Sequence, residues 1–216
     1  MFAVYLELGF EHLLDLRGYD HILFLAGLCA AYSLARWREL LVLVTAFTIG
    51  HSVSLALATL RLVSVNSSLV EFLIPVTIVA TALTNLAGLW REGGRARQPR
   101  EDPAEHRVAA RPLRYALALA FGVIHGLGFS NFLRIVLGDE RNLFVPLLSF
   151  NIGLELAQIV VAGAVLALGA AVVSGVRALR GAAKPETGFP RKAWNAAVSL
   201  AVGGTAATMA LQRWPW

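Results

Sequence analysis

The stretch from Phe150 to Val173, "FNIGLELAQIVVAGAVLALGAAVV", decides the fold of this chain. It contains a single charged residue, Glu155. About 20 consecutive apolar residues are enough for a helix to cross the hydrocarbon core of a bilayer. In lipid, backbone groups are satisfied only within a helix or a closed barrel, and this run is too long for a barrel strand. The stretch therefore predicts a membrane-spanning helix.

The rest of the chain has the same character. Of its 216 residues, 57% are hydrophobic and only 15% are charged, and the mean hydropathy is +0.64. We predict one all-α membrane domain over 1–216, a polytopic helical bundle with spans at about 19–35, 39–61, 67–90, 113–135, 143–176 and 191–212. The segment before them, "MFAVYLELGFEHLLDLRG" (1–18), lacks the basic start of a signal peptide. It predicts a short amphipathic helix or a seventh span. We see no clear internal repeat.

Basic residues gather in the joints after the first, third and fifth predicted spans, which explains the net charge of +5 without nucleic-acid binding. Such joints face the cytoplasm by the positive-inside rule. The longest of them, 91–112, is rich in Arg, Gly and Pro and predicts a flexible cytoplasmic loop. Cys29 is the only cysteine, so the chain has no internal disulfide.

Ionisable side chains inside membrane spans are costly and by default mark function. Once the basic joints are placed in the cytoplasm, these side chains fall in or near the outer half of the membrane. They come from five different spans, and we expect them to form one cluster: Asp20, His21, His51, Glu71, His125 and Glu155. Imidazoles and carboxylates without thiolates suit Ni²⁺, Zn²⁺ or Co²⁺. We expect three further residues to support the ligands without binding the ion: His12, Asn151 and Gln158.

The same residues also have structural interpretations, which the sequence leaves open. Asp20 would serve equally as a helix N-cap, and Glu71 would be favourable in the first turn of its helix. His51 and His125 would each be suited to a hydrogen bond between helices.

Five segments, taken in order, resemble the signatures of the HupE/UreJ family of bacterial inner-membrane proteins. They are "GYDHILFLAGL" (18–28), "FTIGHSVSLALA" (47–58), "VEFLIPVTIVATALTNL" (70–86), "GVIHGLGFSNFL" (122–133) and "FNIGLELAQIVV" (150–161). The family is associated with hydrogenase and urease accessory functions, and its members are regarded as nickel or cobalt permeases. The resemblance implies that the clustered residues, with Asn151, occupy motif positions, and that partners in metalloenzyme maturation exist.

Three functions follow as hypotheses. The first is an inner-membrane permease that captures a divalent metal on the periplasmic side. The second is a membrane-embedded hydrolase, with Glu71 or Glu155 as the general base beside a zinc-type site. The third is a metal sensor or assembly partner.

Overall fold

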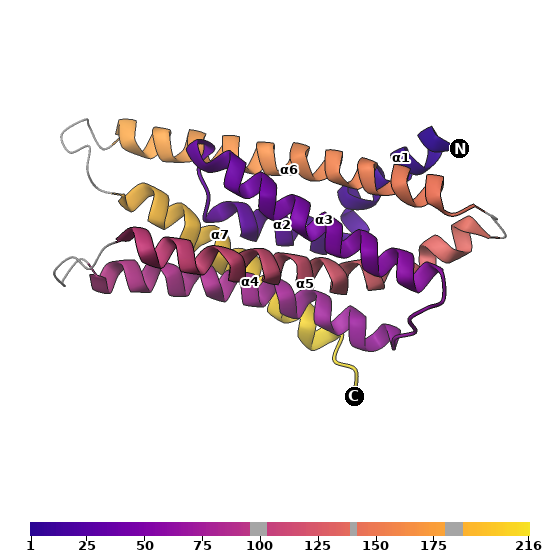
Figure 1. The fold of residues 1–216 in the computed structure, drawn as a ribbon. Helices are drawn as coiled ribbons and strands as arrows, with labels where there is room; N and C mark the ends of the chain where they lie inside the picture. The colour runs from indigo at the N-terminus through magenta and orange to yellow at the C-terminus, as the bar shows by residue number, and fades with distance from the viewer. Residues whose placement is uncertain (96–102, 139–141, 180–187) are drawn as a thin grey trace.

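The computed structural model describes residues 1–95, 103–138, 142–179 and 188–216, and within this part of the chain it contains helices and no strand (Figure 1). This confirms the all-α prediction. The helices are α1 (Phe2–Leu14), α2 (Asp20–Ala30), α3 (Trp37–Thr59), α4 (Ser67–Arg95), α5 (Pro103–Leu137), α6 (Phe144–Leu179) and α7 (Phe189–Gln212), with 3-10 turns at Leu16–Gly18 and Leu34–Arg36.

Four of these helices, α3, α4, α5 and α6, contain stretches long and apolar enough to cross a membrane. Helix α7 has the length, 24 residues, but a less apolar sequence. Many large apolar side chains on the long helices are exposed, as expected of surfaces that face lipid; Ile135 is 80% and Leu168 57% exposed. The stretch 91–112 contributes to the end of α4 and the start of α5, and residues 96–102 of this predicted loop lie outside the described residues.

The first predicted span, 19–35, differs in the structure. Helix α2 has only 11 residues and is preceded by the 13-residue α1. At 1.5 Å per residue these two helices measure about 17 and 20 Å, so neither crosses a core of about 30 Å but together they do. The break between them begins where Asp15 turns extended (φ −64°, ψ 114°) and continues through the 3-10 turn to Tyr19. The segments 1–14 and 20–30 are thus the two halves of one broken span.

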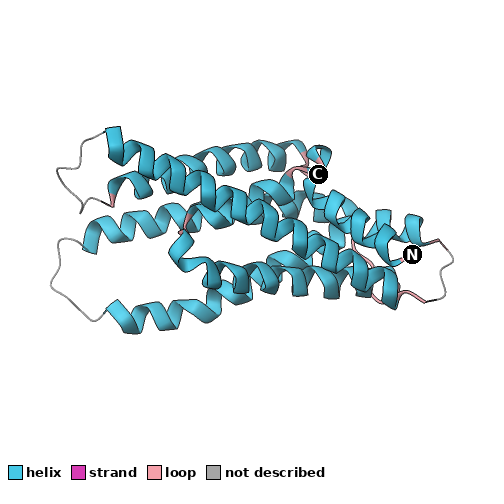
Figure 2. Ribbon diagram, turned by 90° about the horizontal axis from the view of Figure 1, so that it is seen from above, coloured by secondary structure: helices cyan, strands magenta, loops and turns pink. Residues whose placement is uncertain are grey.

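The axes of the long helices are roughly parallel, so the bundle has two ends (Figures 1 and 2). We call the end with the Leu34–Arg36 turn, the last turns of α4 and α6 and the first turns of α5 and α7 the basic end. The opposite end has the last turns of α3 and α5 and the first turns of α4 and α6 (Figure 1). Helix α1 packs along α6, α3 along α5 and α4 along α7, while α2 lies among α4, α6 and α7.

Glycines allow two helix pairs, α3·α5 and α1·α6, to touch backbone to backbone. The α3·α5 pair illustrates the contact. A methyl group added to Gly50 of α3 would collide with the carbonyl of Leu119 in α5, and one added to Gly122 of α5 would collide with the carbonyl of Phe47 in α3. Small residues at such crossings are how helices approach closely in membranes, where apolar burial gives no drive for association. Because His51 directly follows Gly50, this crossing fixes the depth of that histidine in the bundle.

Candidate metal centre

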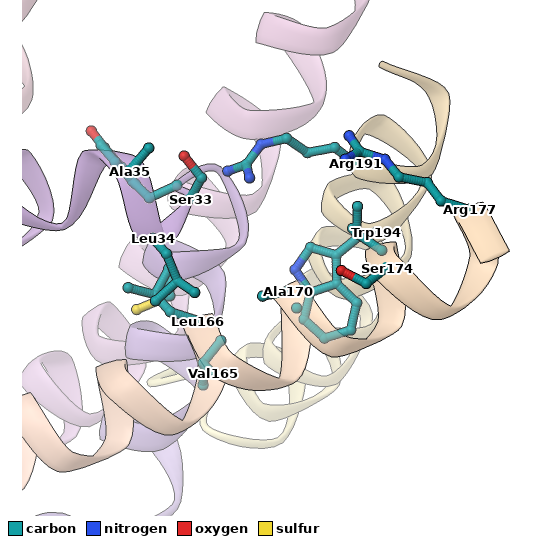
Figure 3. Close-up of a pocket in the computed structure, with 14 residues that line it drawn as sticks. Ser33, Leu34, Ala35, Val165, Leu166, Ala170, Ser174, Arg177, Arg191 and Trp194 are labelled. Carbon is teal, nitrogen blue, oxygen red and sulfur yellow. The ribbon is translucent and has the colours of Figure 1, made fainter. Parts of the chain in front are cut away.

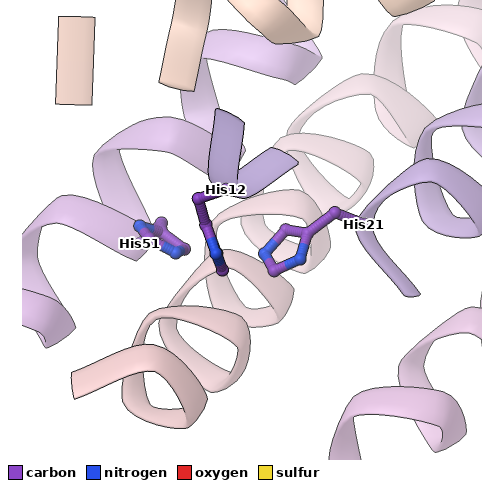
Figure 4. Close-up of side chains that lie close together, drawn as sticks. All are labelled: His12, His21 and His51. Atoms are coloured by element: carbon purple, nitrogen blue, oxygen red, sulfur yellow. The ribbon is translucent and has the colours of Figure 1, made fainter. Parts of the chain in front are cut away.

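Three histidines from three separate helices meet inside the bundle (Figure 4). His12 comes from the last turn of α1, His21 from the first turn of α2 and His51 from the middle of α3. One ring nitrogen of each lies within 4.8 Å of the others. An ion held at about 2.0–2.1 Å from each nitrogen needs them about 3–4 Å apart, so small side-chain shifts would bring all three into coordination.

Four of the six ring nitrogens in this group are buried and make no hydrogen bond with the described residues. His51 is fully buried, and neither of its ring nitrogens makes a well-formed hydrogen bond, although the side chain of Asn151 lies close enough to interact with it. Nε2 of both His12 and His21 is likewise buried without a hydrogen bond. A buried polar atom without a partner costs about 1–3 kcal/mol. Several such atoms on three neighbouring histidines indicate a place where a ligand supplies the missing interaction.

Asp20 orients one of the three rings. Its Oδ1 lies 3.1 Å from Nδ1 of His21 and also accepts the backbone N–H of His21 at 2.9 Å. A carboxylate on Nδ1 keeps the proton on that nitrogen and leaves Nε2 free to bind a metal. The second oxygen, Oδ2, lies 3.4 Å from Nη1 of Arg213. The N-cap position of α2 belongs to Tyr19, so Asp20 is the first helical residue and not the cap.

His125 of α5 flanks the group. It is fully buried, and its ring centroid lies 4.9 Å from that of His21. Its Nε2 is 3.0 Å from the hydroxyl of Thr77, which itself donates to the carbonyl of Ile74. The hydroxyl therefore accepts from Nε2–H, and the lone pair on Nδ1 is left buried without a partner. A fourth nitrogen is thus available beside the three.

The two glutamates lie apart from this group. Glu71 is exposed and lines a cavity of about 270 Å³ between α4 and α5 at the opposite end, together with Ser67, Asn131 and Arg134. Glu155 is half-buried and accepts the hydroxyl of Thr45 at 2.8 Å. Neither belongs to the group of close ligand atoms found among the described residues.

Gln158 and Asn151, two of the predicted supporting residues, lie on α6. Gln158 bonds to α3, and Asn151 bonds to the backbone of α6. The side chain of Gln158 accepts the hydroxyl of Thr48 at 2.6 Å, parallel to the bond between Thr45 and Glu155 one turn away. Asn151 donates to the carbonyl of Leu147, and its side chain lies close to the ring of His51 in α3. These side chains form a polar seam between α3 and α6.

His12 was expected to support the ligands, and the structure places one of its ring nitrogens within 4.8 Å of ring nitrogens of His21 and His51. Two further residues near the group were not expected from the sequence. Thr77 and Arg213 were not singled out, because a threonine in a span and an arginine near a chain end are both unremarkable by type. Their roles depend on contacts between α4 and α5 and between α7 and α2.

A second cavity, of about 200 Å³, lies at the basic end between the end of α2, α6 and α7 (Figure 3). Arg177, Arg191 and Trp194 line it together with small and apolar side chains, and the lining includes neither an imidazole nor a carboxylate. The cavity therefore does not offer the ligands of a divalent metal, and the histidine group remains the candidate centre.

Comparison with known proteins yields one match. The model of the HupE/UreJ protein family matches residues 1–214. No curated protein and no solved structure matches the chain. The match covers α1 and α7 as well as the five segments that carry the resemblance, and so includes both His12 and Arg213. The chain is a membrane protein that belongs to the HupE/UreJ family.

Proposed function

We propose that this protein is a permease for Ni²⁺ or a similar divalent transition metal, and that His12, His21 and His51 bind the ion, with His125 as a fourth ligand. The observation that carries the proposal is the convergence of ring nitrogens from three helices, with the buried ring of His125 4.9 Å from that of His21 between centroids. Membership of the HupE/UreJ family supports a role in metal transport. Imidazole suits Ni²⁺, Co²⁺ and Zn²⁺ alike, so the choice of metal is a matter for measurement.

Transport fits the site better than hydrolysis does. A zinc hydrolase needs a carboxylate near the metal-bound water to act as general base. Glu71 is exposed near the opposite end, and Glu155 is engaged by Thr45. The carboxylate nearest the imidazoles, Asp20, already contacts both His21 and Arg213. The polar seam between α3 and α6 instead offers oxygen atoms beyond the histidines, as a path for an ion requires.

We further propose that the basic end faces the cytoplasm of a bacterial cell and the opposite end faces the periplasm. The basic joints support this orientation through the positive-inside rule. The ion would then enter from the opposite end and reach His12, which lies inside the bundle and is half-buried, whereas His51 and His125 are fully buried.

Uptake of radioactive nickel by cells that express the protein tests the proposal. Cells with the wild-type protein should accumulate more nickel than cells without it, and His51→Ala should remove the difference. The matched control is His106→Ala, which removes the one histidine to which the proposal assigns no role and should leave uptake unchanged. Equal uptake with and without the protein at trace nickel, and again with cobalt and zinc, would exclude a permease. Tightly bound metal with no uptake would instead favour the hydrolase or sensor.

A further inference from the structure

The two glycine-packed helix pairs are built in the same way. In the α3·α5 pair, Gly50 faces the carbonyl of Leu119 and Gly122 faces the carbonyl of Phe47. In the α1·α6 pair, Gly153 faces the carbonyl of Leu6 and Gly9 faces the carbonyl of Phe150. The neighbouring backbone nitrogens correspond as well, since Gly50 approaches that of Val123 and Gly153 that of Phe10.

Short sequence matches follow the same correspondence. Helix α1 reads Leu-x-x-Gly-x-x-His over 6–12, and α5 reads the same over 119–125. Helix α3 reads Phe-x-Ile-Gly over 47–50, and α6 reads the same over 150–153. The contacts thus reveal a repeat that was not apparent in the sequence, because the matching residues are few and scattered. Within it, His12 corresponds to His125.

The corresponding helices run in opposite directions. Tyr5 of α1 packs with Leu133 and Leu137 near the opposite end, whereas Leu13 packs with residues nearer the basic end, such as Leu40 and Leu166. Helix α1 therefore runs toward the basic end, and α5 runs away from it (Figure 1). In the same way α3 runs toward the opposite end and α6 away from it (Figure 1).

The third helices complete the pattern. Helix α4 follows α3, as α7 follows α6, and these two helices pack against each other. A methyl group at Gly203 of α7 would lie 2.9 Å from the Cβ of Ala82 in α4. A rotation that superposes the first half of the chain on the second places the α1·α6 pair on the α5·α3 pair. The same rotation places the α4·α7 pair on itself. This is the behaviour of a two-fold axis that lies across the bundle.

We propose that the chain consists of two inverted repeats, the broken span α1–α2 with α3 and α4, and α5 with α6 and α7, and that it works by exchanging the conformations of the α1·α6 and α3·α5 pairs. The role given to this exchange rests on the proposed transport function. Inverted repeats with a site at their interface and a broken helix beside it are the architecture of carriers that open alternately to the two sides of a membrane. His12 belongs to one pair and His51 to the other, so relative motion of the pairs opens or closes the site.

The exchange makes a quantitative prediction. Leu60 at the end of α3 corresponds to Gly163 in α6, and Phe144 at the start of α6 corresponds to Leu41 in α3. The distance from Leu60 to Phe144 near the opposite end is therefore the counterpart of the distance from Gly163 to Leu41 nearer the basic end. If the conformations of the pairs are exchanged, the two distances exchange values, so one lengthens as the other shortens.

Spin labels on cysteines at these positions test this by pulsed electron paramagnetic resonance in nanodiscs. All four positions are exposed, and Gly163 has open space for a side chain. The single native cysteine is buried and is replaced by Cys29→Ala. The control joins Phe2 to Leu168, both exposed and both within the α1·α6 pair. Each pair of labels is measured without metal, with Ni²⁺ and with a chelator, at several pH values.

We expect each of the two counterpart distances to show two populations. Any condition that changes the ratio of these populations should shift the two mean distances in opposite directions. The control should show one constant distance. Equal shifts in the same direction, a control that shifts as much, or single unchanging distances under all conditions would overturn the proposal. Failure of the permease proposal has a different signature, namely absent uptake. Opposite shifts driven by pH alone would still support the repeat exchange.

Discussion

At the scale of the residue, the central feature is His51, which is fully buried and whose ring nitrogens make no well-formed hydrogen bond. Such a residue costs folding free energy unless a ligand binds it, and function is the usual reason to retain it. The sequence was enough to select His21, His51 and His125, because ionisable groups in apolar helices are rare. It did not reveal the place of His12, because the depth of α1 depends on its contact with α6 through Gly9 and Gly153.

We expect His51→Leu to separate stability from binding. The change removes two unpartnered buried nitrogens, so the metal-free protein should be more stable, by about 1–3 kcal/mol. The stabilisation that Ni²⁺ gives the wild type should disappear. Thermal unfolding in detergent, with and without Ni²⁺, measures both effects. A metal-free variant less stable than the metal-free wild type would show that His51 has a partner in the folded protein.

Asp20→Asn should weaken metal binding without removing any ligand. The amide no longer holds the proton on Nδ1 of His21 as a carboxylate does, and loss of such a partner typically costs 10–100-fold in metal affinity. Isothermal titration with Ni²⁺ gives the affinity. Glu7→Gln, which neutralises an exposed carboxylate on α1, is the matched control. Equal losses in both variants would mean that only overall charge matters.

At the scale of the element, the break between α1 and α2 and the glycine crossings determine where the ligands lie. Residue periodicity and hydropathy predicted the long helices, because a long apolar run has few alternatives in lipid. They did not predict the broken span, since the apolar residues before Asp15 and after Asp20 belong to two short helices with separate packing. Hydropathy also did not predict which way a carboxylate faces. The position of Glu71 in its span suggests a depth in the membrane similar to that of the histidines, but the residue lies on an exposed face of α4.

Alanine at two glycines of α6 should have effects of opposite sign. Gly153→Ala places a methyl group against the backbone of Leu6 and should destabilise the protein by about 1–3 kcal/mol or more, since backbone cannot move aside cheaply. Gly163→Ala meets open space and should be neutral or stabilising by up to about 1 kcal/mol, because alanine is the better helix former. Thermal or denaturant unfolding of the two variants in detergent decides the point. Similar effects would mean that α1 does not pack on α6 as described.

At the scale of the whole molecule, an ion bound by His12, His21 and His51 would connect α1, α2 and α3, which otherwise pack chiefly on other partners. A ligand that binds only the folded state stabilises it, by about 2.7 kcal/mol at 100 times its dissociation constant. We therefore expect Ni²⁺ to raise the unfolding temperature in proportion to the logarithm of its concentration. Scanning fluorimetry over a nickel series checks this, and a Mg²⁺ series is the control, because Mg²⁺ prefers oxygen ligands.

The last helix ends beside the start of α2, the second half of the broken span. Arg213 reaches Asp20, and Trp214 packs edge-on against Phe72 of α4 with ring centroids 5.2 Å apart, while His12 lies one helix from Met1. The residues that follow α7 are therefore coupled to His21 through Asp20. A tag fused after them would lie close to this contact, and a polyhistidine tag would add competing metal ligands of the same chemistry. A peptide epitope without histidine or cysteine is the appropriate handle for metal measurements on this protein.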